Sequence, residues 1–253
     1  MPLLEVRNLG VRFGGVVALD SVSFDVESGE VVALIGPNGA GKTTLFNVIT
    51  RVYRPNAGAV LIDGQSVQGI PAHQVIRHGL ARTFQNVALF RTMTVLDNVL
   101  VGDHTKTPSG WLQASVPLPG ALRAESAARR RAMEMIDFVG LAPVAMRPVA
   151  MLPFGTQKRV ELARALVSKP RLLLLDEPAG GISHQEVDAM ADLLRKVHQE
   201  LAVTMLLVEH HMTFVMGISE RVVVLDFGKK IAEGTPAEVQ RNPAVIEAYL
   251  GAA

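Results

Sequence analysis

The chain has 253 residues, of which 49% are hydrophobic, and it carries 25 Lys+Arg against 24 Asp+Glu. That length and apolar content fit one large α/β domain, or a core with a small subdomain. The balanced charge and the 5% aromatic content argue against a dedicated nucleic-acid binder. Because cysteine is absent, disulfides, thiolate metal sites and cysteine nucleophiles are excluded.

The N-terminal segments predict an antiparallel β-sheet. Leu3–Val6 and Val16–Val26 alternate polar and apolar positions and contain β-branched residues, which is typical of half-buried strands. Gly58–Asp63 is a third apolar segment that ends in an Asp-Gly pair, a common hairpin turn. We expect these strands to pack on the edge of the core.

Short apolar runs further along the chain predict buried parallel strands, because each is too short for an ordinary helix. They are Val31–Ile35, Leu172–Leu175, Met205–Val208 and Val222–Leu225. Helical patterns lie between them, at Thr43–Thr50, Gly155–Val167 and Glu186–Leu201. This alternation of strand and helix predicts a doubly wound α/β sheet.

Residues 103–122 mix Pro, Gly, Ser and Thr around the only tryptophan and predict a loop or loose insertion. A helix over Ala124–Val139 is expected to follow, with Arg129–Arg131 on a solvated face. No internal repeat is visible, so we expect a single domain.

A glycine-rich segment follows the first buried strand. It is Gly36-Pro37-Asn38-Gly39-Ala40-Gly41-Lys42-Thr43-Thr44, which satisfies the Walker A pattern G-x-x-x-x-G-K-[ST]. Glycines let backbone N–H groups turn inward, and these amides form an anion nest with the following helix N-terminus. We expect Lys42 to reach the β- and γ-phosphates of ATP and the Thr43 hydroxyl to ligate Mg²⁺. The alternative is a glycine-rich turn that merely precedes a helix.

Two acids, Asp176 and Glu177, end the apolar run Leu172–Leu175. A buried parallel strand delivers its last residues to the edge of the sheet where ligands bind in open α/β folds. Asp176 is therefore expected to hold Mg²⁺ through water, and Glu177 to polarise the attacking water as a general base. The alternative is an ordinary strand end with solvated acids.

With these motifs in this order, nearly the whole chain resembles the ATP-binding subunits of ABC transporters. The resemblance implies a P-loop NTPase (RecA-like) core with an N-terminal antiparallel β subdomain and an inserted α-helical subdomain. It implies that Phe13 stacks on adenine, the alternative being a core phenylalanine at the β edge. Gln85 matches the Q-loop glutamine, which ligates Mg²⁺ and faces the membrane subunits. His210 matches the switch histidine at the γ-phosphate, the alternative being an ordinary loop histidine.

The slot of the family's signature motif, usually L-S-G-G-Q, holds Leu152-Pro153-Phe154-Gly155-Thr156-Gln157. In the family, two chains sandwich two ATP molecules, and each signature helix points at the γ-phosphate bound by the opposite subunit. Pro153 replaces the serine, Thr156 replaces the glutamine, and Gly155 can still offer its backbone N–H. The D-loop, Gly180-Gly181-Ile182-Ser183, lacks its aspartate, and His211 stands where an aspartate is common. These departures put communication between the two ATP sites in doubt more than nucleotide binding.

The C-terminal segment Gly234–Gly251 looks like the tail of branched-chain amino acid importer ATPases, a group whose relatives also serve urea and short amides. Glu209–Met212 and Thr94–Val99 resemble the same group. Apolar side chains fall on one helical face of the tail, at Val245, Ile246, Tyr249 and Leu250. A docked terminal helix would produce the same pattern by packing alone.

The resemblance implies one ABC ATPase domain over residues 1–253. Within it we expect a β subdomain at about 1–30 and 58–70, a core at 29–90 and 168–253, and a helical subdomain at about 91–167. The start of the chain lacks a signal-peptide pattern, and no apolar stretch approaches the ~20 residues of a bilayer span. We therefore expect a peripheral location on the cytoplasmic face of the membrane.

The implied function is the motor of an importer for branched-chain amino acids or related amides. ATP would close a homodimer or heterodimer of such subunits, and hydrolysis would reopen it. The segment Gln85–Arg91 would transmit the conformational change to permease subunits. A periplasmic binding protein would deliver the substrate to those subunits, and no nucleic acid is involved. The alternatives are a soluble ABC ATPase of repair or translation, and the motor of an exporter. A P-loop kinase outside the family is disfavoured by the signature helix and His210.

Pro153 generates a first prediction, because it removes the hydroxyl that the signature serine offers to the γ-phosphate. Restoring it with Pro153→Ser is expected to strengthen ATP-driven closure, raising ATP affinity and the ATPase rate of the chain assembled with its partners. An unchanged rate together with an unchanged affinity would contradict this expectation.

Overall fold

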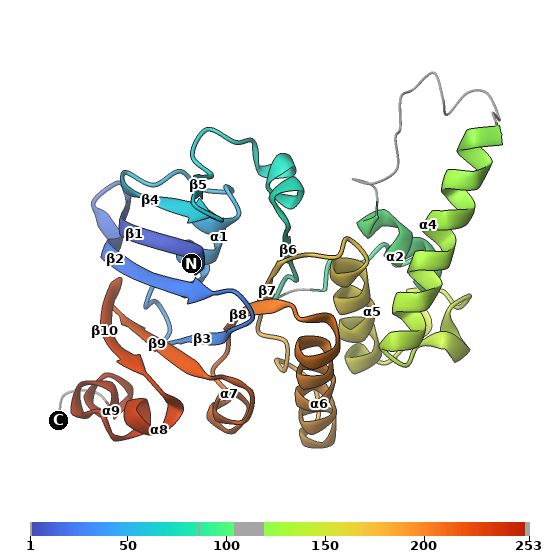
Figure 1. The fold of residues 1–253 in the computed structure, drawn as a ribbon. Coiled ribbons are helices and arrows are strands. Elements are labelled where there is room, and N and C mark those ends of the chain that lie inside the picture. The colour runs from blue at the N-terminus through green and yellow to red at the C-terminus, as the bar shows by residue number, and fades with distance from the viewer. Residues whose placement is uncertain (1, 86, 104–118, 251–253) are drawn as a thin grey trace. The chain divides into compact units, whose positions relative to one another are not determined.

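The computed structural model describes residues 2–85, 87–103 and 119–250 (Figure 1). The chain forms two compact units. The first unit consists of Met1–Arg82, Arg171–Gly180 and His184–Ala253, and the second of Thr83–Pro170 and Gly181–Ser183. The helical subdomain expected at about 91–167 lies within the range of the second unit, while the subdomain boundaries stay a prediction.

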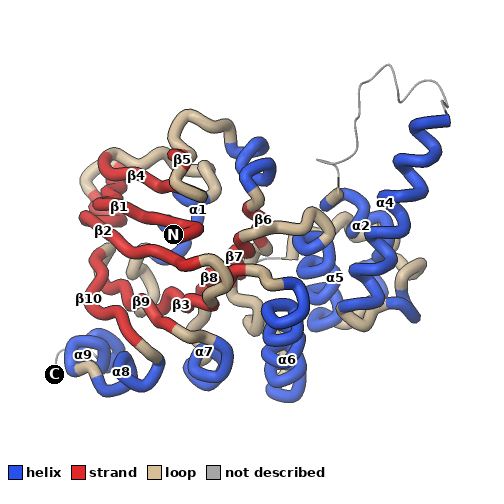
Figure 2. The backbone as a smooth tube through the Cα atoms, viewed as in Figure 1, coloured by secondary structure: helices blue, strands red, loops and turns tan. Residues whose placement is uncertain are grey.

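The first unit contains the predicted antiparallel sheet, with strand order β2-β1-β4-β5 (Figure 2). Its strands are β1 (Pro2–Phe13), β2 (Val16–Glu27), β4 (Ala57–Ile62) and β5 (Gln65–Ser66). The predicted turn between β4 and β5 has positive φ at both Asp63 and Gly64, 53° and 72°. Two consecutive left-handed residues match the twist of a tight hairpin, which explains the Asp-Gly pair.

The second sheet of this unit has six strands in the order β10-β9-β3-β8-β7-β6. They are β3 (Val31–Ile35), β6 (Leu80–Arg82), β7 (Leu172–Asp176), β8 (Thr204–Val208), β9 (Arg221–Asp226) and β10 (Lys229–Gly234). All neighbours pair in parallel except β9 and β10. The four predicted parallel strands are therefore confirmed, and every residue of β3, β7 and β8 is buried. The sequence analysis missed β6 and β10.

Helices of the first unit include the two predicted at Thr43–Thr50 and Glu186–Leu201, which begin and end close to those positions, and others that the sequence did not predict. They are α1 (Lys42–Ile49), α6 (His184–Leu201), α7 (Met212–Ile218), α8 (Pro236–Arg241) and α9 (Pro243–Leu250), with a 3-10 helix at Ala72–His78. The apolar face expected on the tail is only partly buried, because Val245 is 6% exposed whereas Leu250 is 82% exposed. Among the described residues, no helix has the length and hydropathy that a membrane span needs.

The second unit is helical, with α2 (Val95–Gly102), α4 (Pro119–Phe138) and α5 (Phe154–Leu166). Of the loop predicted at 103–122, residues 104–118 lie outside the described residues, and the last four already belong to α4. The expectation that Arg131 lies on a solvated helix face is wrong. It forms an ion pair with Asp103, whose side chain is only 2% exposed. A buried carboxylate needs such a partner, and the partner lies 28 residues away along the chain.

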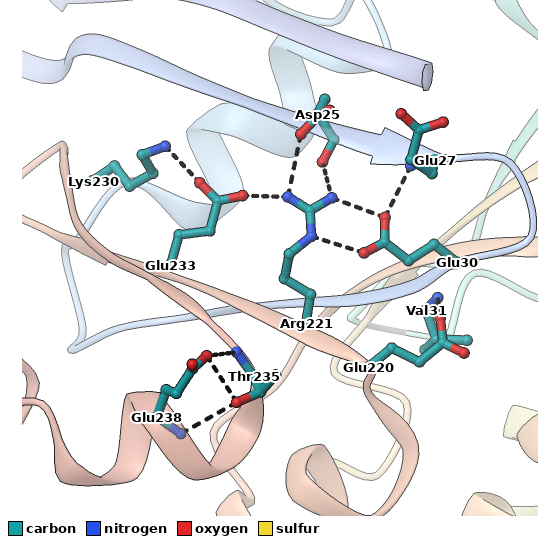
Figure 3. Close-up of polar contacts among 10 residues, drawn as sticks. All are labelled: Asp25, Glu27, Glu30, Val31, Glu220, Arg221, Lys230, Glu233, Thr235 and Glu238. Atoms are coloured by element: carbon teal, nitrogen blue, oxygen red, sulfur yellow. Dashed lines mark hydrogen bonds and ion pairs between the residues drawn. The ribbon is translucent and has the colours of Figure 1, made fainter. Parts of the chain in front are cut away.

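Arg221 joins the two sheets of the first unit (Figure 3). From the start of β9, its guanidinium donates to Glu30 at 2.7 and 2.8 Å and to the Asp25 carbonyl oxygen of β2 at 2.8 Å. It also forms an ion pair with Glu233 of β10. The guanidinium thus holds one sheet against the other with several charge-assisted hydrogen bonds at once.

This cluster predicts a pH-dependent stability. Burial raises the pKa of Glu30, but the hydrogen bonds and charge of Arg221 outweigh it and leave the pKa below its ordinary value of 4.5. A depressed carboxyl pKa stabilises the fold above the unfolded value, and that stability is lost as the pH falls through the folded pKa. Glu30→Gln is expected to lower the free energy of unfolding at pH 7 by about 1–2 kcal/mol.

The measurement is urea unfolding as a function of pH. Below about pH 4.5 the difference between wild type and Glu30→Gln should shrink. The exposed Glu247 offers a matched control, and Glu247→Gln should leave the free energy of unfolding unchanged at every pH. A difference for Glu30→Gln that stays constant down to pH 2 would contradict the assignment.

Candidate functional site

The glycine-rich segment forms a loop between β3 and α1 in which packing demands its glycines. Gly36, Gly39 and Gly41 have positive φ, 151°, 83° and 98°. A Cβ on Gly36 would lie 2.0 Å from the carbonyl oxygen of Leu225, and one on Gly41 would lie 2.6 Å from that of Ala18. Neighbouring backbone therefore fixes the course of this loop, and only glycine fits at these two positions.

Lys42 begins α1 and folds back over the loop. Its Nζ donates to the carbonyl oxygens of Gly36 at 2.6 Å and Pro37 at 2.8 Å. Burial lowers the pKa of Lys42, and the negative charge of Glu177 opposes that shift. Thr43 and Thr44 follow in the first turn, where no acidic side chain and no side-chain cap occupies the helix N-terminus. The loop thus offers an ammonium and uncapped amides to an anion.

Asp176 ends β7 with its side chain 4% exposed, and it forms an ion pair with Arg82 of β6 at 2.8 Å. Arg82 also donates to Asn47 at 2.8 Å and to Thr50 at 3.1 Å, both at the C-terminal half of α1. One guanidinium therefore links the strand that carries Asp176 to the helix that carries Lys42. The sequence did not single out Arg82, although a cation at the end of a short apolar segment was an available signal.

Glu177 follows in a left-handed conformation, with φ of 48°. Its amide donates to the carbonyl oxygen of Val208 at 2.9 Å, and its own carbonyl accepts from Gly180 at 3.0 Å. The Glu177 Oε1 atom lies 3.8 Å from Nδ1 of His210. A non-glycine residue in this region is strained and persists only where its surroundings hold it. The first unit thus brings together Lys42, Asp176, Glu177 and His210.

Phe13, at the end of β1, is 47% exposed, so the alternative of a core phenylalanine is wrong. Its ring meets Tyr53 edge-on, with 5.1 Å between the ring centroids. An aromatic surface that remains half exposed is available for stacking on a flat ligand.

Gln85 and the signature slot lie in the second unit. Glu161 of α5, 3% exposed, accepts from the amides of Phe84 at 3.2 Å and Ala88 at 3.5 Å, on either side of Gln85. Arg164 donates to the carbonyl oxygen of Ala88 at 2.6 Å. The segment around Gln85 is therefore fastened to the signature helix.

In the signature slot, Pro153 is the N-cap residue of α5 and provides no side-chain cap. Leu152 and Gly155 are buried, Phe154 is 43% exposed, and Thr156 is half-buried. Gln157 donates from Nε2 to the carbonyl oxygen of Leu152 at 2.8 Å. Pro153 fits where it stands because a helix start needs no backbone donor from this residue.

Oxygen donors for a hard cation are few. Within the described part of the chain, no group of three or more His, Cys, Asp or Glu side chains could hold a metal ion. Asp176 and the Thr43 hydroxyl remain expected ligands only. Mg²⁺ is usually bound by one or two protein oxygens together with substrate phosphates and water.

The C-terminal helix α9 lies beside the glycine-rich loop that follows β3. A cavity of about 540 Å³ is lined by Pro37–Ala40, the β9–β10 turn at Asp226 and Phe227, and Ala244, Glu247 and Ala248 of α9. Burial raises the pKa of Tyr249, opposed by a hydrogen-bonding interaction with the backbone of Gly36. The terminal helix α9 therefore faces the loop with Ala244, Glu247 and Ala248, and not with its exposed apolar side chains.

The model of the ABC transporter family matches residues 19–180, and that of the branched-chain amino acid ATP-binding cassette transporters matches residues 229–253. The chain is 44% identical to the high-affinity branched-chain amino acid transport ATP-binding protein BraF of Pseudomonas aeruginosa, covering 100% of this chain and 99% of that one. The crystal structure of the ADP conformation of MJ1267, an ATP-binding cassette of an ABC transporter, aligns over 100% of both chains with TM-score 0.85 and 29% identity. The dimeric structure of MJ0796, a bacterial ABC transporter cassette, aligns over 92% of this chain and 98% of that one, with TM-score 0.77 and 26% identity.

The loop geometry predicts unequal effects of two similar substitutions. Gly36→Ala should destabilise the protein by several kcal/mol, because the methyl group would collide with the backbone of Leu225. Gly39→Ala also places a side chain at positive φ, 83°, but meets no neighbouring atom within 4 Å, so it should cost only about 1–2 kcal/mol. Urea unfolding measures both free energies. Equal losses would show that strain alone, and not packing, selects glycine at position 36.

Proposed function

The chain belongs to the ABC transporter family, and we propose that it is the ATP-hydrolysing motor subunit of an importer for branched-chain amino acids. The similarity to BraF over the full length of both chains carries this proposal. The match of residues 229–253 to the branched-chain amino acid group supports it independently of the catalytic motifs. The exporter and the soluble repair or translation ATPase share those motifs, but neither has a comparable observation in its favour.

Nucleotide binding is assigned to the loop Gly36–Thr44. ATP would displace Lys42 from the carbonyl oxygens of Gly36 and Pro37, so that the ammonium contacts the β- and γ-phosphates instead. Backbone amides of the loop and of the first turn of α1 would hold the remaining phosphate oxygens. Phe13 would stack on the adenine ring.

Hydrolysis is assigned to the acids after β7 and to the residue after β8. Glu177 would orient the attacking water and accept its proton. His210, close to the Glu177 carboxylate, would contact the γ-phosphate as charge develops on it. Thr43, Asp176 and Gln85 are the proposed Mg²⁺ ligands. When bound, the ion would supply positive charge that neutralises the phosphates.

Transport needs more than one chain. By analogy with the dimeric MJ0796 cassette, residues 152–156 of one subunit would complete the nucleotide site of a second ATP-binding subunit. The segment at Gln85 would contact permease subunits, to which a periplasmic binding protein delivers the substrate. We place the chain on the cytoplasmic face of the membrane as a peripheral subunit.

The substrate is tested by uptake. Deleting the gene should abolish high-affinity uptake of labelled leucine, isoleucine and valine by intact cells, and wild-type protein should restore it. A Lys42→Ala protein, produced at the same level, is the control and should not restore uptake. Cells that lose uptake of urea or short amides instead, while leucine uptake stays normal, would refute the branched-chain assignment.

Glu177→Gln tests the catalytic assignment. The amide has the size of the carboxylate but cannot take a proton, so kcat should fall by about 10²–10⁴-fold. ATP affinity, measured with a fluorescent nucleotide, should be retained because the loop is untouched. A variant that hydrolyses ATP at the wild-type rate would remove Glu177 from the role of general base.

A further inference from the structure

Glu209 is a charged residue for which the proposed chemistry gives no role. It follows β8 directly and its side chain is 0% exposed. A carboxylate is costly to bury unless hydrogen bonds replace its water. The partners of this carboxylate therefore indicate why the position holds a glutamate.

The two carboxylate oxygens face two different segments of the first unit. Oε1 accepts a hydrogen bond from the amide of Ala179 at 2.7 Å, in the turn that begins at Glu177. Oε2 accepts from the amide of His210 at 3.0 Å, with a longer contact from that of His211 at 3.4 Å. One side chain thus ties the turn after β7 to the loop after β8.

This tie acts where the backbone is strained. Glu177 has a φ of 48°, and its turn is closed by the hydrogen bond from Gly180. The two segments are also linked by the hydrogen bond from the Glu177 amide to Val208, at the strand end, and by the contact between the Glu177 carboxylate and His210. Because strained conformations persist only when their surroundings over-determine them, Glu209 supplies a further fixed point of the turn.

We infer that Glu209 is a positioning residue that holds the carboxylate of Glu177 and the imidazole of His210 in one fixed arrangement. The inference rests on the proposed function, in which these two side chains act on the same γ-phosphate. It concerns the chemical step, since the described hydrogen bonds of Glu209 go to the turn after β7 and to the loop after β8. Losing the hydrogen bonds of Glu209 should slow ATP hydrolysis without weakening ATP binding.

Glu209→Gln is the most direct test. Glutamine has nearly the same shape as glutamate. Its NH₂ group is a donor and would face a backbone N–H donor on one of the two segments, so the hydrogen bond to that segment is lost and only the other remains. We expect kcat to fall by about 10–100-fold, as for a small misplacement of reacting groups. The KM for ATP and the affinity for a fluorescent nucleotide should stay within about twofold of wild type, since no loop contact is lost.

Glu30→Gln is the matched control, because it also removes a partly buried carboxylate of the first unit but lies away from the reacting groups. Both variants should unfold at lower urea concentration than wild type, and only Glu209→Gln should lose kcat at 25 °C. If Glu209→Gln fails to fold, Glu209→Asp keeps the charge but is one methylene too short to reach both segments, and the same split is expected.

The outcomes separate the inference from the proposed function. An unchanged kcat in Glu209→Gln, or in Glu209→Asp where that variant is used, overturns the inference, and so does a loss of ATP affinity as large as the loss of kcat. If Glu177→Gln retains hydrolysis, the proposed catalytic assignment fails and the inference fails with it. If Glu177→Gln is inactive and Glu209→Gln hydrolyses normally, only the inference fails.

Discussion

A buried ion pair between Arg82 and Asp176 joins the elements around which the nucleotide site is arranged. Both side chains are nearly inaccessible, 7% and 4% exposed. Burying two charges is favourable only when further hydrogen bonds satisfy them, and Asn47 and Thr50 provide two such bonds to Arg82. The pair therefore fixes β6, β7 and α1 together. Removing either charge would leave the other uncompensated at the base of the site.

Around this ion pair, the residues proposed to carry the chemistry lie in short segments that follow parallel strands. Such segments gather at one edge of the sheet because parallel strands end on the same side. Their conformations are unusual, as the positive φ of Gly36, Gly41 and Glu177 shows. At the glycines the backbone of Leu225 and Ala18 enforces the conformation. At Glu177 the hydrogen bonds from neighbouring segments do so. Local strain is thus maintained by packing against the rigid sheet.

How far the sequence predicts the structure depends on the range of the interactions involved. Val31–Ile35 and Leu172–Leu175 are local signals, because an apolar run bounded by glycine or acid specifies a buried strand by itself. The phosphate loop is local too. Arg221 gave no such signal, since its partners Glu30 and Asp25 lie 191 and 196 residues away along the chain. Arg131 was assigned to solvent for the same reason, and the three-residue strand β6 is too short to show a pattern.

Gln85 and the signature slot could be assigned only through family resemblance, and the structure adds how they are connected within the second unit. Glu161 accepts hydrogen bonds from backbone amides on both sides of Gln85, and Arg164 donates one to the carbonyl oxygen of Ala88. These bonds connect the segment that is proposed to contact the permease to α5. Pro153 caps that same helix without a side-chain bond. A displacement of the Gln85 segment would therefore be passed to α5 through these charge-assisted hydrogen bonds, which are stronger than hydrogen bonds between neutral groups. In the proposed function, Pro153 would affect only the far end of this connection, the proposed contact with the γ-phosphate of the opposite subunit. The coupling of Gln85 to the signature helix does not depend on the serine that Pro153 replaces.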